Sequence, residues 1–226
     1  MKLPWRIFFG IDVLLNITGI LLEQPLLIQI SKPLLMPLLA GWFLTETPGR
    51  SVFFRIAILF ALLFSTLGDV LLMFEGGLFF IAGLGAFLMA HVWYIGAFSR
   101  ISSFRRGYLS QQPLIVLPLL AYPLILLWFL WNGIPSGMKI PVCLYAGVIT
   151  IMALSVLNLK DKLESGHFTA MMTGALLFVF SDSLIAVSKF GQTFNGVRPA
   201  IMLTYVAGQY LLILCAIRWQ NQDNRL

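Results

Sequence analysis

Two aspartates lie inside long apolar runs of this sequence, which makes them the first candidates for chemistry. Asp69 lies in the run 64–73, and Asp182 lies in the run 175–186. A carboxylate at the centre of a membrane-spanning helix costs about 3 kcal/mol, so an acidic residue there indicates a functional site. Two such carboxylates can divide the work of acid and base, because one can stay protonated while the other stays ionised. The pair therefore predicts acid–base chemistry or proton transfer inside a membrane.

One lysine, Lys32, also falls within an apolar run, beside Pro33 and Pro37, which can bend a helix. Its side chain can reach the membrane surface by extending along the helix, as lysines near helix ends do. Alternatively, the ammonium group pairs with an anion, for which the candidates are Asp69, Asp182 and a lipid phosphate. Both interpretations are open from the sequence.

An aromatic and polar stripe marks one predicted helix, where Phe87, His91, Tyr94 and Phe98 follow one another at spacings of 4, 3 and 4. These spacings place the four side chains on one helix face. A lone histidine is more often a packing residue than a catalyst. The only other histidine, His167, lies in a predicted loop, so we expect no histidine-based metal site.

Further polar residues lie at helical spacing in other apolar runs. Ser181 stands beside the second aspartate, and Tyr205 and Gln209 share a helix face. Asp12 and Asn16 lie one turn apart in the first apolar run. For this last pair, packing between helices and a functional role are equally compatible with the sequence.

The composition defines the class of protein that must position these residues. Of the 226 residues, 59% are hydrophobic and 11% are charged, whereas about a quarter of the residues of a soluble domain are charged. We therefore expect an all-α, polytopic membrane protein that forms a single transmembrane domain over residues 1–226. The net charge of +6 is spread over short loops, so nucleic acid is not an expected partner. The oligomeric state is left open.

Apolar runs near the length of about 20 residues that a membrane-spanning helix needs predict a bundle of eight transmembrane helices. The predicted spans cover about 5–22, 26–43, 52–73, 77–98, 114–131, 140–158, 168–187 and 199–219. Short connections between them favour antiparallel neighbours in a compact bundle.

The basic residues predict that both termini are cytoplasmic, because cytoplasmic loops carry an excess of Lys and Arg. One side holds eleven of them and the other side holds three, with Lys32 inside a span. The eleven are Lys2, Arg6, Arg50, Arg55, Arg100, Arg105, Arg106, Lys160, Lys162, Arg218 and Arg225, and the three are Lys139, Lys189 and Arg198.

Five motifs in the same order along the eight spans resemble the YhhN/TMEM86 family over nearly the whole chain. They are Ser31-Lys-Pro-Leu34, Gly68-Asp-Val-Leu-Leu-Met73, His91-Val-Trp-Tyr94, Ser181-Asp-Ser-Leu-Ile-Ala186 and Tyr205-x-x-x-Gln209. The resemblance implies a cofactor-independent, metal-free lysoplasmalogenase, a multi-pass protein of the bacterial inner (cell) membrane. Such enzymes hydrolyse the vinyl ether bond of lysoplasmalogens to a fatty aldehyde and glycerophosphoethanolamine or glycerophosphocholine. Asp12 and Asn16 lie outside the five motifs.

Given this resemblance, we expect Asp69 and Asp182 to be the catalytic acid and base, in an order that the sequence leaves open. The residues expected to bind the lysophospholipid are Lys32, His91, Tyr94, Ser181, Tyr205 and Gln209. Counting along the predicted spans puts the two aspartates and Lys32 within roughly 6–9 Å of the outer interface.

A transport function is the alternative to hydrolysis. The two aspartates are 113 positions apart, half of the chain, and similar Ala-Leu-Leu-Phe segments precede them at 61–64 and 175–178. This similarity raises the hypothesis of a duplicated four-span unit. In that case the same carboxylates would serve a proton-coupled transporter or lipid flippase.

Overall fold

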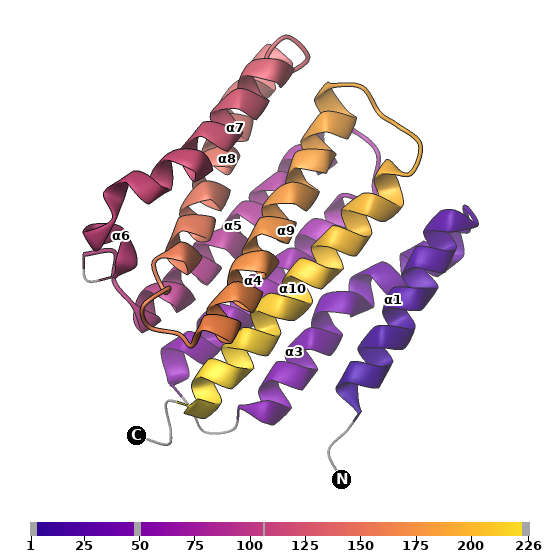
Figure 1. The fold of residues 1–226 in the computed structure, drawn as a ribbon. Helices are drawn as coiled ribbons and strands as arrows, with labels where there is room; N and C mark the ends of the chain where they lie inside the picture. Colours follow the sequence, from indigo (N-terminus) through magenta and orange to yellow (C-terminus); the bar gives the residue numbers. More distant parts are fainter. Residues whose placement is uncertain (1–3, 48–50, 106, 223–226) are drawn as a thin grey trace. The chain divides into compact units, whose positions relative to one another are not determined.

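In the computed structural model, which describes residues 4–47, 51–105 and 107–222, every regular element is a helix (Figure 1). A helix satisfies all its backbone hydrogen bonds internally, which suits the apolar runs of this sequence. The chain divides into two compact units. The first contains the described residues up to Trp93 together with those from Ile213 onward, and the second contains Tyr94–Leu212.

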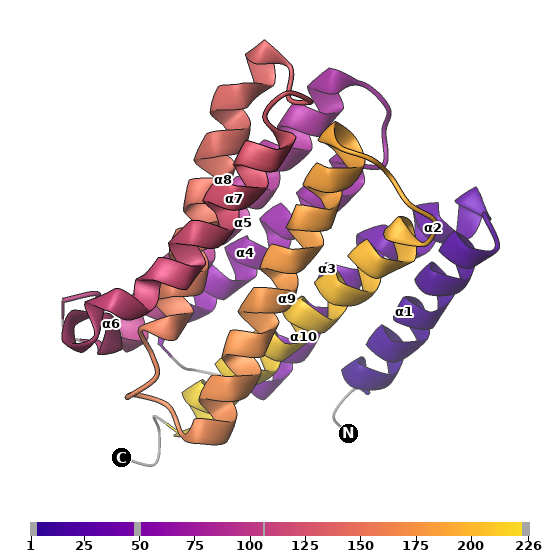
Figure 2. The ribbon, with the colours of Figure 1, turned by 45° about the horizontal axis from the view of Figure 1, so that its top comes forward.

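The first unit begins with α1 (Trp5–Leu21), α2 (Pro25–Ser31), the short 3-10 helix η1 (Lys32–Leu34), α3 (Leu35–Glu46) and α4 (Val52–Leu71). It also contains the first part of α5 (Gly77–Ile101) and the end of α10 (Val197–Gln222). Within it, α1 packs against α2 and α3, and α3 packs against α4. Both views show α1 and α3 side by side (Figures 1 and 2).

The second unit contains the rest of α5, then α6 (Tyr108–Gln111), η2 (Pro113–Val116), α7 (Leu117–Leu130), α8 (Ser136–Leu157) and α9 (Ser165–Phe190). The first part of α10 completes it. Here α8 packs against α7 and α9. Most residues of α7 are exposed, including Trp128 and Phe129, as expected of a helix that faces lipid.

The second apolar run is a helix interrupted by a 3-10 turn. The turn covers Lys32–Leu34, between α2 and α3. Pro33 and Pro37 each lack a backbone N–H and cannot donate to the preceding turn of a regular helix. The structure thus places a 3-10 turn next to these prolines, and the bend of the helix stays a prediction.

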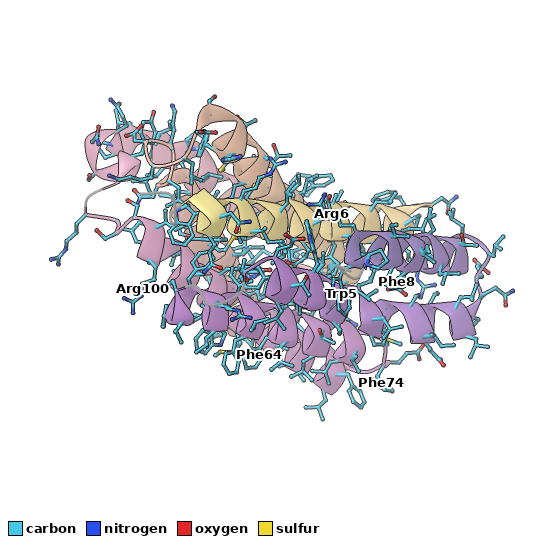
Figure 3. The ribbon with its side chains drawn as sticks, turned by 90° about the horizontal axis from the view of Figure 1, so that it is seen from below. Trp5, Arg6, Phe8, Phe64, Phe74 and Arg100 are labelled. Carbon is cyan, nitrogen blue, oxygen red and sulfur yellow. The ribbon has the colours of Figure 1, made fainter. Side chains whose placement is uncertain are left out.

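The start of α1 is fixed on α3 by two side chains labelled in Figure 3. The Trp5 ring lies against Gly41, where an added Cβ would come within 2.7 Å of the ring. The guanidinium of Arg6 lies 4.6 Å from the ring centre of Trp42. These contacts set the register between α1 and the α2–η1–α3 segment.

Among the described residues, seven helical segments are long and apolar enough to cross a membrane. They include Pro25–Glu46, which joins α2, η1 and α3, and Pro113–Leu130, which joins η2 and α7. The α1 helix has 17 residues, about 25 Å at 1.5 Å per residue, against a hydrocarbon core of about 30 Å. An eighth span and cytoplasmic termini therefore stay predictions. Lys2, Arg50, Arg106 and Arg225, which enter the count of basic residues, lie outside the described residues.

Helix ends differ from the predicted spans by a few residues. The α9 helix covers Ser165–Phe190 instead of 168–187, because its polar end residues continue the backbone hydrogen bonding past the apolar run. Along the sequence, the divisions between the two units fall within α5 and α10 rather than between two four-helix halves. The single domain and the four-span duplication stay hypotheses.

Candidate active site

Asp69 lies near the end of α4 with its side chain only 4% exposed, and it has a cation beside it. The Nζ atom of Lys32 is 3.8 Å from its Oδ1 atom. The 3-10 turn that begins at Lys32 packs against α4. An ammonium group at this distance stabilises the ionised form of a carboxyl group. Of the anions considered for Lys32, the structure places Asp69 beside it.

The backbone around Asp69 is covered by an aromatic ring. A Cβ added to Gly68 would lie 2.6 Å from the Phe87 ring of α5, so only glycine lets this ring reach α4. In the opposite direction, a Cβ on Gly83 would lie 2.8 Å from Leu72. These two glycines thus allow α4 and α5 to pack closely at Gly68, the residue before Asp69 in the sequence.

The predicted stripe on α5 is buried along its whole length. Phe87, His91, Tyr94 and Phe98 are all at most 4% exposed. His91 belongs to the same unit as Asp69 and follows Phe87 by one turn. Its predicted contact with the lipid stays a prediction.

Asp182 lies on α9 in the second unit, and its partner is a phenol. The hydroxyl group of Tyr145, on α8, donates a hydrogen bond to Oδ2 of Asp182. Tyr145 is buried and Asp182 is half-buried. This bond occupies one carboxyl oxygen and fixes the orientation of the group.

Sequence analysis missed Tyr145. The signal available was a single tyrosine hydroxyl within an apolar run, and a buried tyrosine hydroxyl usually finds a hydrogen-bond partner. Nothing in the spacing identifies that partner, because Asp182 is 37 positions away on the next helix.

Four of the predicted lipid-binding residues make contacts between helices of the second unit. The hydroxyl group of Tyr94 donates to Oε1 of Gln209 at 2.6 Å, and both side chains are fully buried. The Ser181 hydroxyl donates to the Ile201 carbonyl at 2.9 Å. The Tyr205 ring packs edge-on against Phe178, with ring centres 5.4 Å apart. That these four residues bind lipid stays a prediction.

The α9 and α10 helices approach closely enough for these contacts because two glycines face each other. An added Cβ on Gly174 would lie 3.0 Å from the Gly208 carbonyl oxygen, and one on Gly208 would lie 2.8 Å from that of Gly174. Small residues at such a crossing let two membrane helices pack backbone to backbone.

Two parts of the predicted site stay predictions. Asp69 belongs to the first unit and Asp182 to the second, and their joint action on one substrate molecule stays a prediction. Asp69 lies two residues before the end of its helix and Asp182 eight residues before the end of its own, so helix ends alone do not give them a common height. Within the described residues, no group of three His, Cys, Asp or Glu side chains is arranged to hold a metal ion.

The fold and these sites define an integral, multi-pass membrane protein of the all-helical class that holds carboxylates among its helices. The YhhN family model matches residues 27–216, and the chain therefore belongs to the YhhN family. This confirms the resemblance found in the five motifs. No solved structure matches the chain.

Curated relatives extend the comparison to named proteins. Bovine "Lysoplasmalogenase TMEM86A" is 31% identical over 82% of this chain and 74% of its own length. Mouse "Lysoplasmalogenase TMEM86B" is 34% identical over 70% of this chain and 62% of its own length. A "Lysoplasmalogenase" of Mycobacterium bovis is 30% identical over 67% of this chain and 57% of its own length. The matches thus cover between about three fifths and three quarters of these relatives.

Proposed function

We propose that this protein is a lysoplasmalogenase, which hydrolyses the vinyl ether bond of lysoplasmalogens. The products are a fatty aldehyde and glycerophosphoethanolamine or glycerophosphocholine. The observation that carries the proposal is the different partner of each buried aspartate, Lys32 for Asp69 and Tyr145 for Asp182. The names of the relatives from cattle, mouse and Mycobacterium bovis support the choice of reaction.

The reaction needs one proton donor and one anion. The donor protonates the alkene carbon that does not carry the ether oxygen, and this leaves an oxocarbenium ion. Water adds to the cation and loses a proton, which gives a hemiacetal. The hemiacetal then collapses to the aldehyde and the free glycerol hydroxyl. Glycosidases handle a related cation with a pair of carboxyl groups.

We assign the acid to Asp182 and the anion to Asp69. The ammonium group of Lys32 is 3.8 Å from Asp69 and favours its charged form. Asp182 instead accepts a hydrogen bond from a neutral phenol, which brings no positive charge to it, so we give it the role of the acid. Asp69 would then stabilise the oxocarbenium ion and accept a proton from the attacking water. This division requires both carboxyl groups to reach one substrate molecule.

The remaining predicted residues would bind the lipid. An ammonium group has three N–H donors, so Lys32 can hold the substrate phosphate while it neighbours Asp69. His91, Tyr94, Ser181, Tyr205 and Gln209 would line the space for the glycerol and the alkenyl chain. We place the protein in the bacterial inner (cell) membrane with both termini in the cytoplasm, which the distribution of Lys and Arg supports.

An aldehyde assay tests the proposal directly. Purified protein in detergent, with chelator present, is expected to release fatty aldehyde from 1-alkenyl lysophospholipids and to release no fatty acid from the matching ester lysolipids. Equal cleavage of both classes would indicate a general lysophospholipase instead. No cleavage, together with accumulation of intact lipid or another solute in proteoliposomes that depends on a pH gradient, would support the transporter or flippase.

A further inference from the structure

Two buried polar residues on α1 lie outside the machinery described above. Asp12 is 6% exposed and Asn16 is 1% exposed, and they lie one turn apart on the same face of the helix. This face belongs to the side of α1 that packs against α2, η1 and α3. All of these elements belong to the first unit.

The amide of Asn16 is held in one orientation. Its Nδ2 atom donates to the Ser31 hydroxyl at 2.9 Å, and that hydroxyl in turn donates to the Leu27 carbonyl. Because the Nδ2 end is fixed by this chain, the Oδ1 end must point the other way. These two hydrogen bonds therefore leave Oδ1 as the end of the amide that can accept from another group.

The buried face of α1 holds two acceptor oxygens that lack a hydrogen-bond donor in the described chain. Oδ1 of Asn16 and Oδ2 of Asp12 are both buried. Within the residues that the structure describes, no group donates a hydrogen bond to either atom. A buried acceptor without a donor costs about 1–3 kcal/mol, and more if it is charged. A ligand that brings N–H donors and a positive charge would remove this cost.

A cation lies next to these acceptors along the same helix contact. Ser31, which holds Asn16, is followed by Lys32, and the turn that contains Lys32 contacts α1. Counted from the α1–α2 connection, Asp12 is nine residues before Leu21 and Lys32 is seven after Pro25. At 1.5 Å per residue these positions are about 14 Å and about 10 Å from the connection, so they are nearly level. The contact thus offers acceptors and a cation side by side, which is the complement of a zwitterion.

We propose that Asp12 and Asn16 bind the primary ammonium of an ethanolamine head group while Lys32 binds the adjacent phosphate. This inference rests on the proposed function, because it assumes a lysophospholipid substrate. An ethanolamine ammonium donates three hydrogen bonds, which suits two oxygen acceptors. A choline group has no N–H donor and is typically bound by aromatic faces. The site therefore selects ethanolamine lysolipids over choline lysolipids.

The test is binding of saturated 1-O-alkyl lysophospholipids, which lack the reactive alkene, to the purified full-length protein in detergent. The unmodified protein is expected to bind the ethanolamine form about tenfold more tightly than the choline form, which corresponds to one charge-assisted hydrogen bond. Asp12→Asn is expected to reduce this ratio to about twofold or less. Glu23→Gln removes an exposed carboxylate at the α1–α2 connection and is expected to keep the full ratio.

Each other outcome overturns the inference. Equal affinity of the unmodified protein for the two head groups would overturn it without any variant. An unchanged ratio in Asp12→Asn, or in Asp12→Ser if the first variant does not fold, would do the same. A third contrary outcome is that NaCl stabilises the unmodified protein but not Asp12→Asn, while the ratio of the two head-group affinities is the same in both. This result would mean that the site binds an inorganic cation only.

Binding and turnover separate the two proposals. The binding ratio does not depend on hydrolysis, whereas aldehyde release from 1-alkenyl lysolipids does not depend on a head-group preference. Protein that binds ethanolamine lysolipid selectively but releases no aldehyde would contradict the proposed function only. Protein that releases aldehyde equally from both head groups, with equal binding, would contradict the head-group site only.

Discussion

The two aspartates differ in their partners. Asp69 has the ammonium group of Lys32 at 3.8 Å, and the Phe87 ring packs against its neighbour Gly68. Asp182 is half-buried and accepts a hydrogen bond from the neutral hydroxyl of Tyr145. The Lys32 partner of Asp69 carries a full positive charge, whereas the Tyr145 partner of Asp182 is neutral. Two aspartates in similar apolar runs thus have partners of different charge.

Removal of either carboxyl group is the most severe test of the roles assigned to Asp69 and Asp182. Asp182→Asn and Asp69→Asn are each expected to lower kcat for vinyl ether cleavage at least about 100-fold, the usual contribution of a positioned acid or base. Asp161→Asn, which changes an exposed carboxylate between α8 and α9, is the matched control and is expected to keep full activity. Full turnover in either site variant, measured by aldehyde release, would remove that residue from the chemistry.

Lys32 is predicted to have the next largest effect, because it distinguishes the Asp69 side of the comparison. Lys32→Gln is expected to lower kcat about 10- to 100-fold, since Asp69 loses the charge that favours its ionised form. Lys32→Arg keeps the charge and is expected to recover part of this loss. Steady-state kinetics decides the role: a rise in KM with unchanged kcat would mean that Lys32 only holds the phosphate.

Tyr145→Phe tests the Asp182 side. Loss of the hydrogen bond to Oδ2 is expected to lower kcat about tenfold with little change in KM, because the acid is no longer held in place. Tyr122→Phe, at an exposed tyrosine on α7, is the control. If Tyr145→Phe lowers thermal stability but leaves kcat and its pH profile unchanged, Tyr145 only supports the packing of α8 on α9.

Tyr94→Phe is expected to have the smallest effect on activity. It leaves Oε1 of Gln209 without its buried donor, which is expected to lower the free energy of unfolding by about 1–3 kcal/mol. Turnover at low temperature should change less than about twofold. Thermal unfolding and the aldehyde assay separate the two effects. A large loss of kcat in a protein of normal stability would mean that the Tyr94 hydroxyl group, and not only its ring, acts on the substrate.

The sequence located the helices and most of the candidate residues for a simple reason. Apolar runs long enough to span a membrane have few alternatives to a helix, because lipid offers no hydrogen bonds to an open backbone. Charged side chains within such runs, such as Asp69, Lys32 and Asp182, are costly and therefore conspicuous. Pro33 and Pro37 likewise indicated an irregularity in the second apolar run, and the structure has a 3-10 turn at Lys32–Leu34.

Partnerships between side chains depended on the tertiary structure. Tyr145 and Asp182 lie on adjacent helices, and Tyr94 and Gln209 are 115 positions apart, so no local spacing connects them. The same holds for Gly174 and Gly208, whose close approach depends on how two helices cross. Sequence alone determined that carboxyl groups, a lysine and tyrosines lie in the membrane, because the cost of burying polar groups is local. Which group faces which was decided by helix packing, since that depends on distances between distant parts of the chain.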